Sequence, residues 1–137
     1  MIDQTDMEII GLLMKNGRMQ WQEIGEIVHL TGQAVKKRID RLEKAGVIEG
    51  YTVKLDHAKM GLETTAFITV YMKTTDHAAF KRFISVSSLV EEAHRISGDG
   101  CYLLKARTGG GQELDAFLDS LLTYGNYKVS LSISRAK

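Results

Sequence analysis

The segment from Trp21 to Gly46 limits the possible folds of this chain more than any other part of the sequence. Thr31 marks its middle and is a preferred helix N-cap, because a threonine hydroxyl accepts a hydrogen bond from a free backbone N–H of the following turn. Apolar residues then recur at i, i+4 and i+7, which is typical of a helix with one buried face: Val35, Ile39 and Leu42. The segment is therefore predicted to form two short helices joined by a tight turn.

The second of these helices carries a basic outer face. On a helical wheel, the side opposite Val35 and its flanks hold polar and mostly basic residues: Gln33, Lys36, Lys37, Arg38, Asp40, Arg41 and Lys44. Such a face suits the major groove of DNA, where lysine and arginine meet phosphates and base edges. The alternative is a solvated surface helix with salt bridges. The helix–turn–helix setting favours DNA.

The residues before this helix predict the rest of a three-helix unit. Residues 3–15 form a first helix, with Asp3 as its N-cap and Asp6 at the positive helix end. Residues 20–29 form the second, with three apolar residues directed inward: Ile24, Ile27 and Val28. Gly25 lies in the middle of this helix, where glycine costs about 1 kcal/mol relative to alanine. We therefore expect the basic helix to cross there with its backbone close.

The overall charge excludes a polycation. The net charge is +1 at pH 7, so affinity for nucleic acid must come from the local basic cluster. No apolar run is long enough to span a bilayer, and the N-terminus lacks a signal-peptide pattern. The single cysteine, Cys101, excludes an internal disulfide and fits a reducing compartment. We expect a cytoplasmic, nucleoid-associated protein with no membrane partner.

The second half of the chain is predicted to be richer in strands. Strands are expected over 65–73, 90–97, 101–108 and 127–134, and helices over 76–86 and 111–122. This β-α-β-β-α-β order is that of the ferredoxin-like split arrangement. The predicted fold class is α+β: a winged helix-turn-helix in residues 1–50, a strand or linker in 51–62, and a ferredoxin-like βαββαβ domain in 63–137.

The first predicted strand of this domain is apolar on both faces. Ala66, Ile68, Val70 and Met72 lie on one face, and Phe67 and Tyr71 on the other. In a ferredoxin-like unit both helices cover the same face of the sheet, and an exposed apolar sheet face marks an interaction surface. We therefore predict that the sheet packs against a second copy of the chain. A dimer would also double the DNA-contacting helices.

The run from Leu30 to Ile48 resembles the DNA-binding unit of the Lrp/AsnC (feast/famine) transcription regulators. Asp3 and Asp6 lie in a segment similar to the family's opening helix. Ser97-Gly98-Asp99, followed by Tyr102-Leu103-Leu104-Lys105, resembles its C-terminal effector domain, so the resemblance spans nearly the whole chain. It implies a sequence-specific DNA-binding transcriptional regulator that is not an enzyme.

The resemblance also implies an assembly and an effector. Family members form dimers through the C-terminal sheets, often stack into octamers or larger rings, and bend or wrap DNA. Many bind a free amino acid where effector domains of neighbouring dimers meet, which corresponds here to Ser97, Gly98, Asp99, Gly100, Cys101 and Tyr102. The family commonly has an aromatic residue and then an acid where this chain has Gly100 and Cys101. A regulator without a ligand, or with a different effector, therefore stays open.

Six residues are predicted to contact double-stranded DNA. Three are assigned to phosphates and three to base edges: Thr31, Lys36 and Arg38, and Gln33, Lys37 and Arg41, respectively. By resemblance, Arg38 and Arg41 occupy the family's basic positions and Thr31 its usual serine cap. Gly32 and Gln33 stand where Pro and Ser are common, which leaves the sequence preference open.

Three other functions are compatible with the sequence. A nucleoid-architectural protein that bends DNA without a small-molecule effector shares every motif, and only the ratio of specific to non-specific affinity would separate it. The second is a ligand-binding protein whose helical unit docks another protein. The third is an enzyme built on the ferredoxin-like half, although no acid/base pair converges there.

Other candidate sites are rejected. The glycines at 98, 100 and 109–111 match no nucleotide-loop spacing, and the histidines lack metal-ligand spacing. Cys101 lacks a histidine base nearby in the sequence. We expect no cofactor and no metal. Trp21, which opens the second helix, is interpreted as a core anchor rather than a contact to the DNA backbone.

Overall fold

The computed structural model describes all of residues 1–137, and the chain divides into two compact units, Met1–Lys54 and Leu55–Lys137. Each unit has its own hydrophobic core. The division falls inside residues 51–62, the predicted strand or linker. None of the helices combines the length and the apolar character that a membrane crossing would require.

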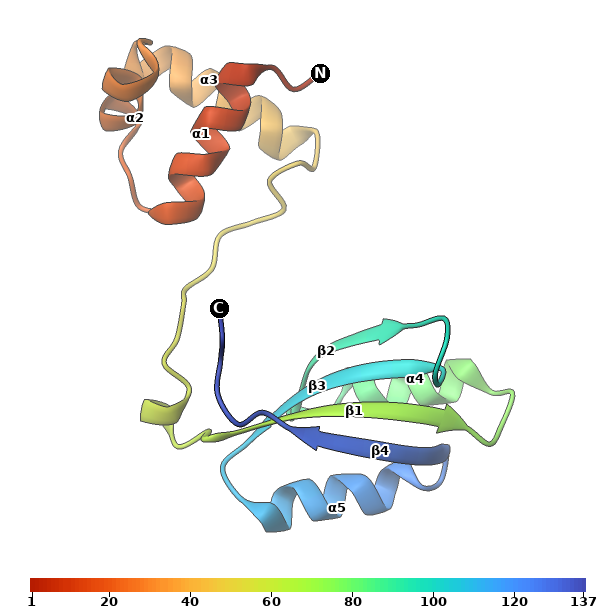
Figure 1. Cartoon of the computed structure of the whole chain (residues 1–137). Helices are drawn as coiled ribbons and strands as arrows, with labels where there is room; N and C mark the ends of the chain where they lie inside the picture. Colours follow the sequence, from red (N-terminus) through yellow and green to blue (C-terminus); the bar gives the residue numbers. More distant parts are fainter. The chain divides into compact units, whose positions relative to one another are not determined.

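The first unit contains three helices, α1 (Gln4–Lys15), α2 (Trp21–Val28) and α3 (Gly32–Lys44) (Figure 1). Asp3 caps α1 in a capping box with Asp6, in which each carboxylate accepts a backbone N–H from the other residue. Thr31 caps α3, and its Oγ1 accepts a hydrogen bond from the Ala34 N–H at 3.1 Å. Both predicted caps are confirmed.

The core of this unit is formed by one buried stripe from each helix. Its buried apolar residues are Ile9 from α1, Ile24 from α2, and Val35 and Ile39 from α3. The predicted stripe of α3 is confirmed, and it includes buried Leu42. The prediction that Ile27 points inward is wrong, because the core is contacted by Ile24 and Val28, four residues apart, while Ile27 is exposed.

Gly25 is required by the turn, not by a crossing helix. A Cβ at this position would lie 2.3 Å from the backbone oxygen of Leu30, which belongs to the turn between α2 and α3. The chain reverses so tightly that the turn folds back over α2, and His29 adopts the left-handed conformation at the C-cap. The close approach was predicted, but its partner is corrected from α3 to the turn.

The segment that follows α3 contains no strand. Gly46 ends the helix region with a positive φ, and residues 49–56 are extended without pairing. Of the alternatives for residues 51–62, the linker is therefore the one present, and the strand is wrong. A short 3-10 helix, η1 (Ala58–Met60), precedes the sheet of the second unit.

The second unit is a four-stranded antiparallel sheet with two helices. Its elements are β1 (Thr64–Met72), α4 (His77–Ser85), β2 (Val90–Arg95), β3 (Tyr102–Thr108), α5 (Gly111–Leu121) and β4 (Gly125–Leu131). The strand order is β2-β3-β1-β4, so β1 and β3 are central. The predicted β-α-β-β-α-β order is confirmed. The last strand ends at Leu131, so Ile133 lies beyond it and is exposed.

Both helices pack on one face of this sheet. Alternate residues of β1 and β3 are buried beneath them: Ala66, Ile68, Val70, Tyr102, Leu104 and Ala106. Phe80 of α4 and Phe117 and Leu121 of α5 complete the core. The opposite face of the sheet carries no helix of this unit.

Candidate nucleic-acid interface and effector loop

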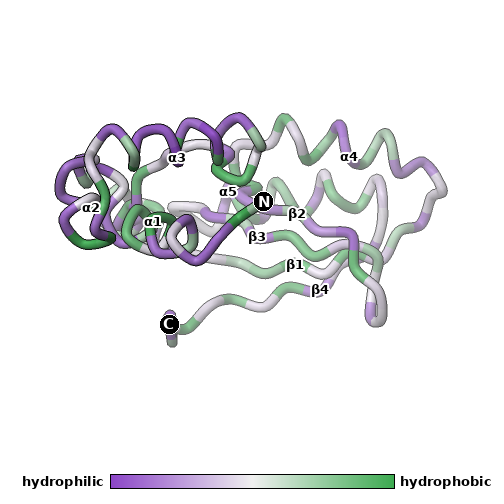
Figure 2. The backbone as a smooth tube through the Cα atoms, turned by 90° about the horizontal axis from the view of Figure 1, so that it is seen from above, coloured by the Kyte–Doolittle hydropathy of each residue, from purple (hydrophilic) through white to green (hydrophobic).

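The buried stripe of α3 determines which side chains face outward. Because Val35 and Ile39 are buried, Gln33, Lys37 and Lys44 are exposed on the opposite side of the helix. The trace of α3 in Figure 2 accordingly alternates strongly hydrophilic positions with apolar ones. No carboxylate lies within ion-pair distance of Lys37. This lysine is therefore free to meet a phosphate or a base edge.

Lys36 lies on the flank of this face and has two neighbours. Its Nζ is 2.7 Å from an Asp40 carboxylate oxygen and 5.4 Å from the centroid of the Trp21 ring. The ion pair joins residues one turn apart on an exposed helix face, where such pairs contribute only about 0.3–0.5 kcal/mol. A phosphate can therefore displace Asp40 from Lys36 at small cost.

Trp21 is not a core residue. It is 44% exposed and lines a groove of about 800 Å³ between the start of α2 and the start of α3. The same groove is lined by Thr31 and Gln33, two of the predicted DNA contacts. The prediction of a core anchor is wrong, because Trp21 is the first residue of α2 and its ring lies in this groove beside Lys36 of α3. The Thr31 oxygen accepts from Ala34, which leaves its O–H free to donate.

Arg38 and Arg41 are held by carboxylates of α1. Arg38 Nη1 lies 2.7 Å from Asp3 Oδ2 and 3.0 Å from Asp6 Oδ1, and Arg41 Nη2 lies 2.5 Å from Asp6 Oδ2. The Asp6 side chain is fully buried, and that of Arg38 is 28% exposed. Both arginines were predicted as DNA contacts. In the folded unit, their positive charge is directed first at these acids.

The pairing changes the acid–base properties of both partners. The hydrogen bond from Arg38, followed by the one from the Asp6 backbone, lowers the pKa of the Asp3 carboxyl from 3.8 to about 2. The hydrogen bonds of Arg38 to the side chains of Asp3 and then Asp6 raise the pKa of Arg38 further above its usual value. The ion pair between Asp3 and Arg38 is therefore present throughout the neutral range.

The predicted effector residues form the loop between β2 and β3. Gly98 and Gly100 both have positive φ, which favours glycine. A Cβ on Gly100 would lie 2.5 Å from Thr69 Cγ2 of β1, so the loop folds closely over the open face of the sheet. Because of this close contact, the aromatic residue that is common in the family could not replace Gly100 without a rearrangement of the loop.

Two hydrogen bonds tie the loop to β1. The Cys101 N–H donates to the Val70 carbonyl at 2.8 Å, and the Tyr71 hydroxyl donates to Asp99 Oδ2 at 2.8 Å. The second bond raises the pKa of Tyr71. The Asp99 carboxylate thus lies at the surface with one neutral donor, and it can accept further donors such as the ammonium group of a ligand.

Tyr102 is turned away from the loop surface. It is buried between the sheet and α4, with its ring centroid 4.6 Å from that of Phe80. Its hydroxyl lies 2.7 Å from His77 Nδ1 at the start of α4. Tyr102 was predicted as one of the effector-binding residues, but its ring is part of the hydrophobic core.

The sequence interpretation missed three partners. Asp3 and Asp6 were assigned only to the helix cap, and Tyr71 only to a sheet surface. A signal for the first pair was present: the acids are three residues apart on α1, and Arg38 and Arg41 are three residues apart on α3, so both sets span one helical turn. Nothing local in the sequence indicated the Tyr71–Asp99 contact.

Comparison with known proteins agrees with this geometry. Residues 2–49 match a family model described as winged helix-turn-helix DNA-binding, and residues 65–137 match one described as the Lrp/AsnC ligand binding domain. The chain is 46% identical over 136 residues to the HTH-type transcriptional regulator LrpB of Bacillus subtilis, covering 99% of this chain and 91% of that protein. It is 36% identical to LrpA of the same organism, covering 98% and 100%.

Solved structures show the same architecture. LrpC of B. subtilis superposes with a TM-score of 0.95 at 28% identity, covering 100% of this chain and 98% of that one. A transcriptional regulator from Neisseria meningitidis, solved as a complex with L-Met, superposes with a TM-score of 0.93 at 27% identity, covering 100% and 93%. The relatives are named as transcriptional regulators, which favours neither an architectural role nor an enzyme. With an N-terminal helix-turn-helix and a C-terminal ligand-binding fold in this order, the chain belongs to the Lrp/AsnC family of DNA-binding transcriptional regulators.

Proposed function

We propose that the exposed side of α3 enters the major groove of an operator, with Gln33 and Lys37 at base edges and Thr31 and Lys36 at phosphates. The observation that carries this proposal is the exposure of Gln33 and Lys37 opposite the buried Val35, with no acid paired to Lys37. The DNA contacts predicted for Arg38 and Arg41 compete with their ion pairs to Asp3 and Asp6.

Selection of bound fragments from genomic DNA tests this function. We expect a small set of enriched sites and an affinity that falls steeply with salt, because lysine–phosphate contacts release counterions. Lys37→Gln should weaken operator binding at the same salt concentration. Enrichment of random fragments with no preferred sequence would contradict a sequence-specific regulator.

We further propose that the open face of the sheet joins two copies of the chain. Phe67 is exposed on this face in the middle of the central strand β1, and Leu103 of β3, opposite Thr69, lies on the same face. Lys105 and Arg107 share the face and lie near Glu91, so its charges are partly balanced within the chain. Higher assemblies such as octamers would extend from this dimer. The mass in solution tests the proposal.

We also propose a free amino acid as the effector, bound at the loop of residues 97–102. The support is the match to a ligand-binding domain model and the L-Met complex of the similar Neisseria regulator. In this chain, Asp99 is the acid of that loop. A thermal-shift screen with single amino acids should reveal one that raises the melting temperature, and Asp99→Asn should abolish the shift. A flat screen would favour a regulator without such an effector.

We also propose, because the chain has a DNA partner, that it acts at the nucleoid in the cytoplasm and that it is not an enzyme. The relatives' names as transcriptional regulators support this assignment. Fluorescence microscopy of a tagged chain should show it overlapping the chromosomal DNA. A signal at the cell envelope would contradict it.

A further inference from the structure

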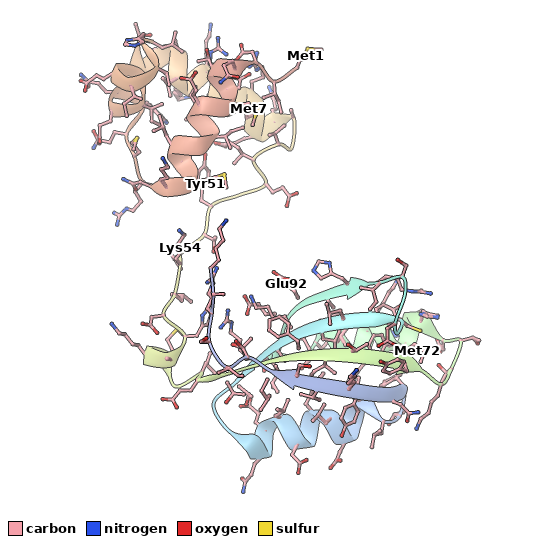
Figure 3. All side chains as sticks on the ribbon, viewed as in Figure 1. Met1, Met7, Tyr51, Lys54, Met72 and Glu92 are labelled. Atoms are coloured by element: carbon pink, nitrogen blue, oxygen red, sulfur yellow. The ribbon has the colours of Figure 1, made fainter.

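The first turn of α1 and the middle of α3 are joined by a closed set of hydrogen bonds. Asp6 Oδ1 accepts from Arg38, while Asp6 Oδ2 accepts from Arg41 and from the Asp3 backbone. Asp3 Oδ1 accepts from the Asp6 backbone at 2.8 Å, and Asp3 Oδ2 accepts from Arg38. Every oxygen of both carboxylates therefore has a donor. The turn lies between the labelled Met1 and Met7 in Figure 3.

This arrangement ties two helices at two points. Asp3 and Asp6 are one turn apart on α1, and Arg38 and Arg41 are one turn apart on α3. Arg38 contacts both acids through one nitrogen, and Asp6 contacts both arginines. The planar guanidinium fixes the directions in which this nitrogen donates, whereas the ammonium group of a lysine rotates freely. The rotation of α3 about its own axis is therefore restrained by α1.

The charges of this set cancel. Two arginines face two aspartates, and Asp6 is fully buried, so its charge cannot be satisfied by water. The lysines of α3 differ: Lys36 has only the exposed Asp40, and Lys37 has no acid within ion-pair distance. A DNA phosphate would thus have to break a partly buried network to reach Arg38, but nothing of the kind to reach Lys37.

We propose that Asp3 and Asp6 are positioning residues that hold Arg38 and Arg41 against α1, so that the arginines orient the recognition helix and the lysines neutralise DNA phosphates. This inference rests on the proposed function, in which α3 contacts DNA. It reassigns the two arginines from contacts to supports. Arg41, whose side chain is 53% exposed, keeps donors that Asp6 does not use.

The salt dependence of DNA binding separates the two roles. Each lysine or arginine that neutralises a phosphate contributes about 0.9 to the slope of log K against log salt concentration on duplex DNA. Removing a phosphate contact therefore lowers that slope by about 1. Removing a support leaves the slope unchanged, but it loosens the alignment of α3 and lowers the ratio of specific to non-specific affinity.

The experiment compares five variants of the full chain: Lys37→Gln, Arg38→Gln, Arg38→Lys, Asp3→Asn and Asp40→Asn. Fluorescence anisotropy at several salt concentrations gives the slope on a random-sequence duplex. The same assay on the best fragment from the genomic selection gives the specificity ratio. Asp3→Asn is the sharpest variant, because asparagine caps a helix about as well as aspartate, so the cap is kept while the charge is lost.

Asp40→Asn is its matched control. Each substitution removes one exposed carboxylate that is paired with a basic side chain of α3. Asp3 is paired with Arg38, and Asp40 is paired with Lys36. We expect Asp40→Asn to tighten binding to the random duplex severalfold and to steepen the slope. We expect Asp3→Asn to leave the slope unchanged and to lower the specificity ratio at least threefold. An unchanged specificity ratio for Asp3→Asn would overturn the proposal, because it would show that α3 keeps its alignment without the Asp3 carboxylate.

The arginine variants give an independent result. Lys37→Gln should lower the slope by about 1, whereas Arg38→Gln should keep the slope and lose specificity. Arg38→Lys should fail to restore specificity, since a freely rotating ammonium on a shorter side chain does not hold the two carboxylates in one fixed orientation. Full rescue by lysine, or a lower slope in Arg38→Gln, would overturn the proposal. Circular dichroism identifies any variant that does not fold. If the Arg38 variants do not fold, the result for Asp3→Asn alone tests the proposal. If the wild-type chain binds neither duplex, the proposed function fails instead.

Discussion

At the scale of single residues, the Asp3 carboxyl links stability to pH. Its pKa in the folded chain is about 2, below the usual 3.8, because of the hydrogen bond from Arg38 and the backbone bond from Asp6. The ionised form is therefore favoured by folding. Its stabilising contribution is complete above pH 3.8 and is lost as the pH falls through 2.

The corresponding prediction concerns Asp3→Asn. Urea unfolding of the wild-type chain between pH 5 and 2 should show a loss of stability to which Asp3 contributes, and this part of the loss should be missing in the variant. The two stability curves should thus converge as the pH falls. Parallel curves over the whole range would contradict the depressed pKa.

Asp6 should matter more for stability than any exposed acid of α1. Its side chain is fully buried and accepts hydrogen bonds from both arginines and from the Asp3 backbone, and leaving such donors without their partner costs about 1–3 kcal/mol. We expect Asp6→Ala to lower the free energy of unfolding by that amount. Glu8→Ala, an exposed acid on the same helix, should change it by less than about 0.5 kcal/mol. Chemical denaturation of both variants measures the difference, and equal effects would contradict the burial argument.

Trp21 provides an optical test, because it is the only tryptophan of the chain. It is half-exposed in the groove shared with Thr31 and Gln33, beside Lys36. DNA bound at α3 should displace water from the indole, so its emission should shift and lose intensity on titration with the selected duplex. Lys37→Gln should require more DNA for the same change. An emission spectrum insensitive to saturating DNA would place the duplex elsewhere.

At the scale of elements, the sequence was sufficient for most of the fold, since caps and periodicity are local. Asp3, Thr31 and Asp76 each begin a helix as predicted, and the βαββαβ order follows from the change of period. The pairing of Arg38 with Asp3 was not predictable in this way, because it joins residues 35 apart. A helical wheel gives the direction of a side chain and not its partner. Trp21 and Ile27 were misplaced for a different reason: α2 has only eight residues, too few for the apolar periodicity to determine which side of the helix is buried.

The turn between α2 and α3 gives a prediction about an element as a whole. A Cβ on Gly25 would meet the Leu30 backbone oxygen at 2.3 Å, which no side-chain rotation relieves. Gly25→Ala should therefore destabilise the chain by about 1–3 kcal/mol, as overpacking does, and should weaken DNA binding by displacing the start of α3. Gly11→Ala is the control, since nothing lies within 4 Å of a Cβ there, and the gain in helix propensity should stabilise α1 by up to about 1 kcal/mol. Thermal unfolding and anisotropy measure both, and a stabilised Gly25→Ala would contradict the tight turn.

At the scale of the whole molecule, each unit has its own core and one exposed surface that suits a binding partner. In the first unit that surface is the lysine side of α3. In the second it is the open face of the sheet, where the helices leave β1 and β3 uncovered. A charged surface suits DNA, and a sheet face with an exposed phenylalanine suits another protein surface. Figure 3 shows the side chain of Glu92 on β2 projecting away from the sheet.

The decisive substitution for the assembly is Phe67→Lys. Phe67 is 39% exposed on the central strand, opposite Lys105 in the register with β3 and Ser130 in that with β4. Fully burying an exposed phenylalanine contributes about 1.5–3 kcal/mol, so covering the 39% that is still exposed contributes roughly 0.6–1.2 kcal/mol per copy, and a two-fold interface loses at least about 1.2 kcal/mol of association. Since about 1.4 kcal/mol is tenfold in affinity, the dimer should weaken about tenfold from this loss, and the two lysine charges placed in the interface should weaken it further. Light scattering on a size-exclusion column should show the mass of one chain for Phe67→Lys at a concentration where the wild type is dimeric.

Val86→Lys, at an exposed position after α4, is the control and should keep the wild-type mass. Equal masses for the two variants would move the interface away from the sheet, whereas a dimer lost only in Phe67→Lys would also remove the doubled recognition helices and weaken operator binding.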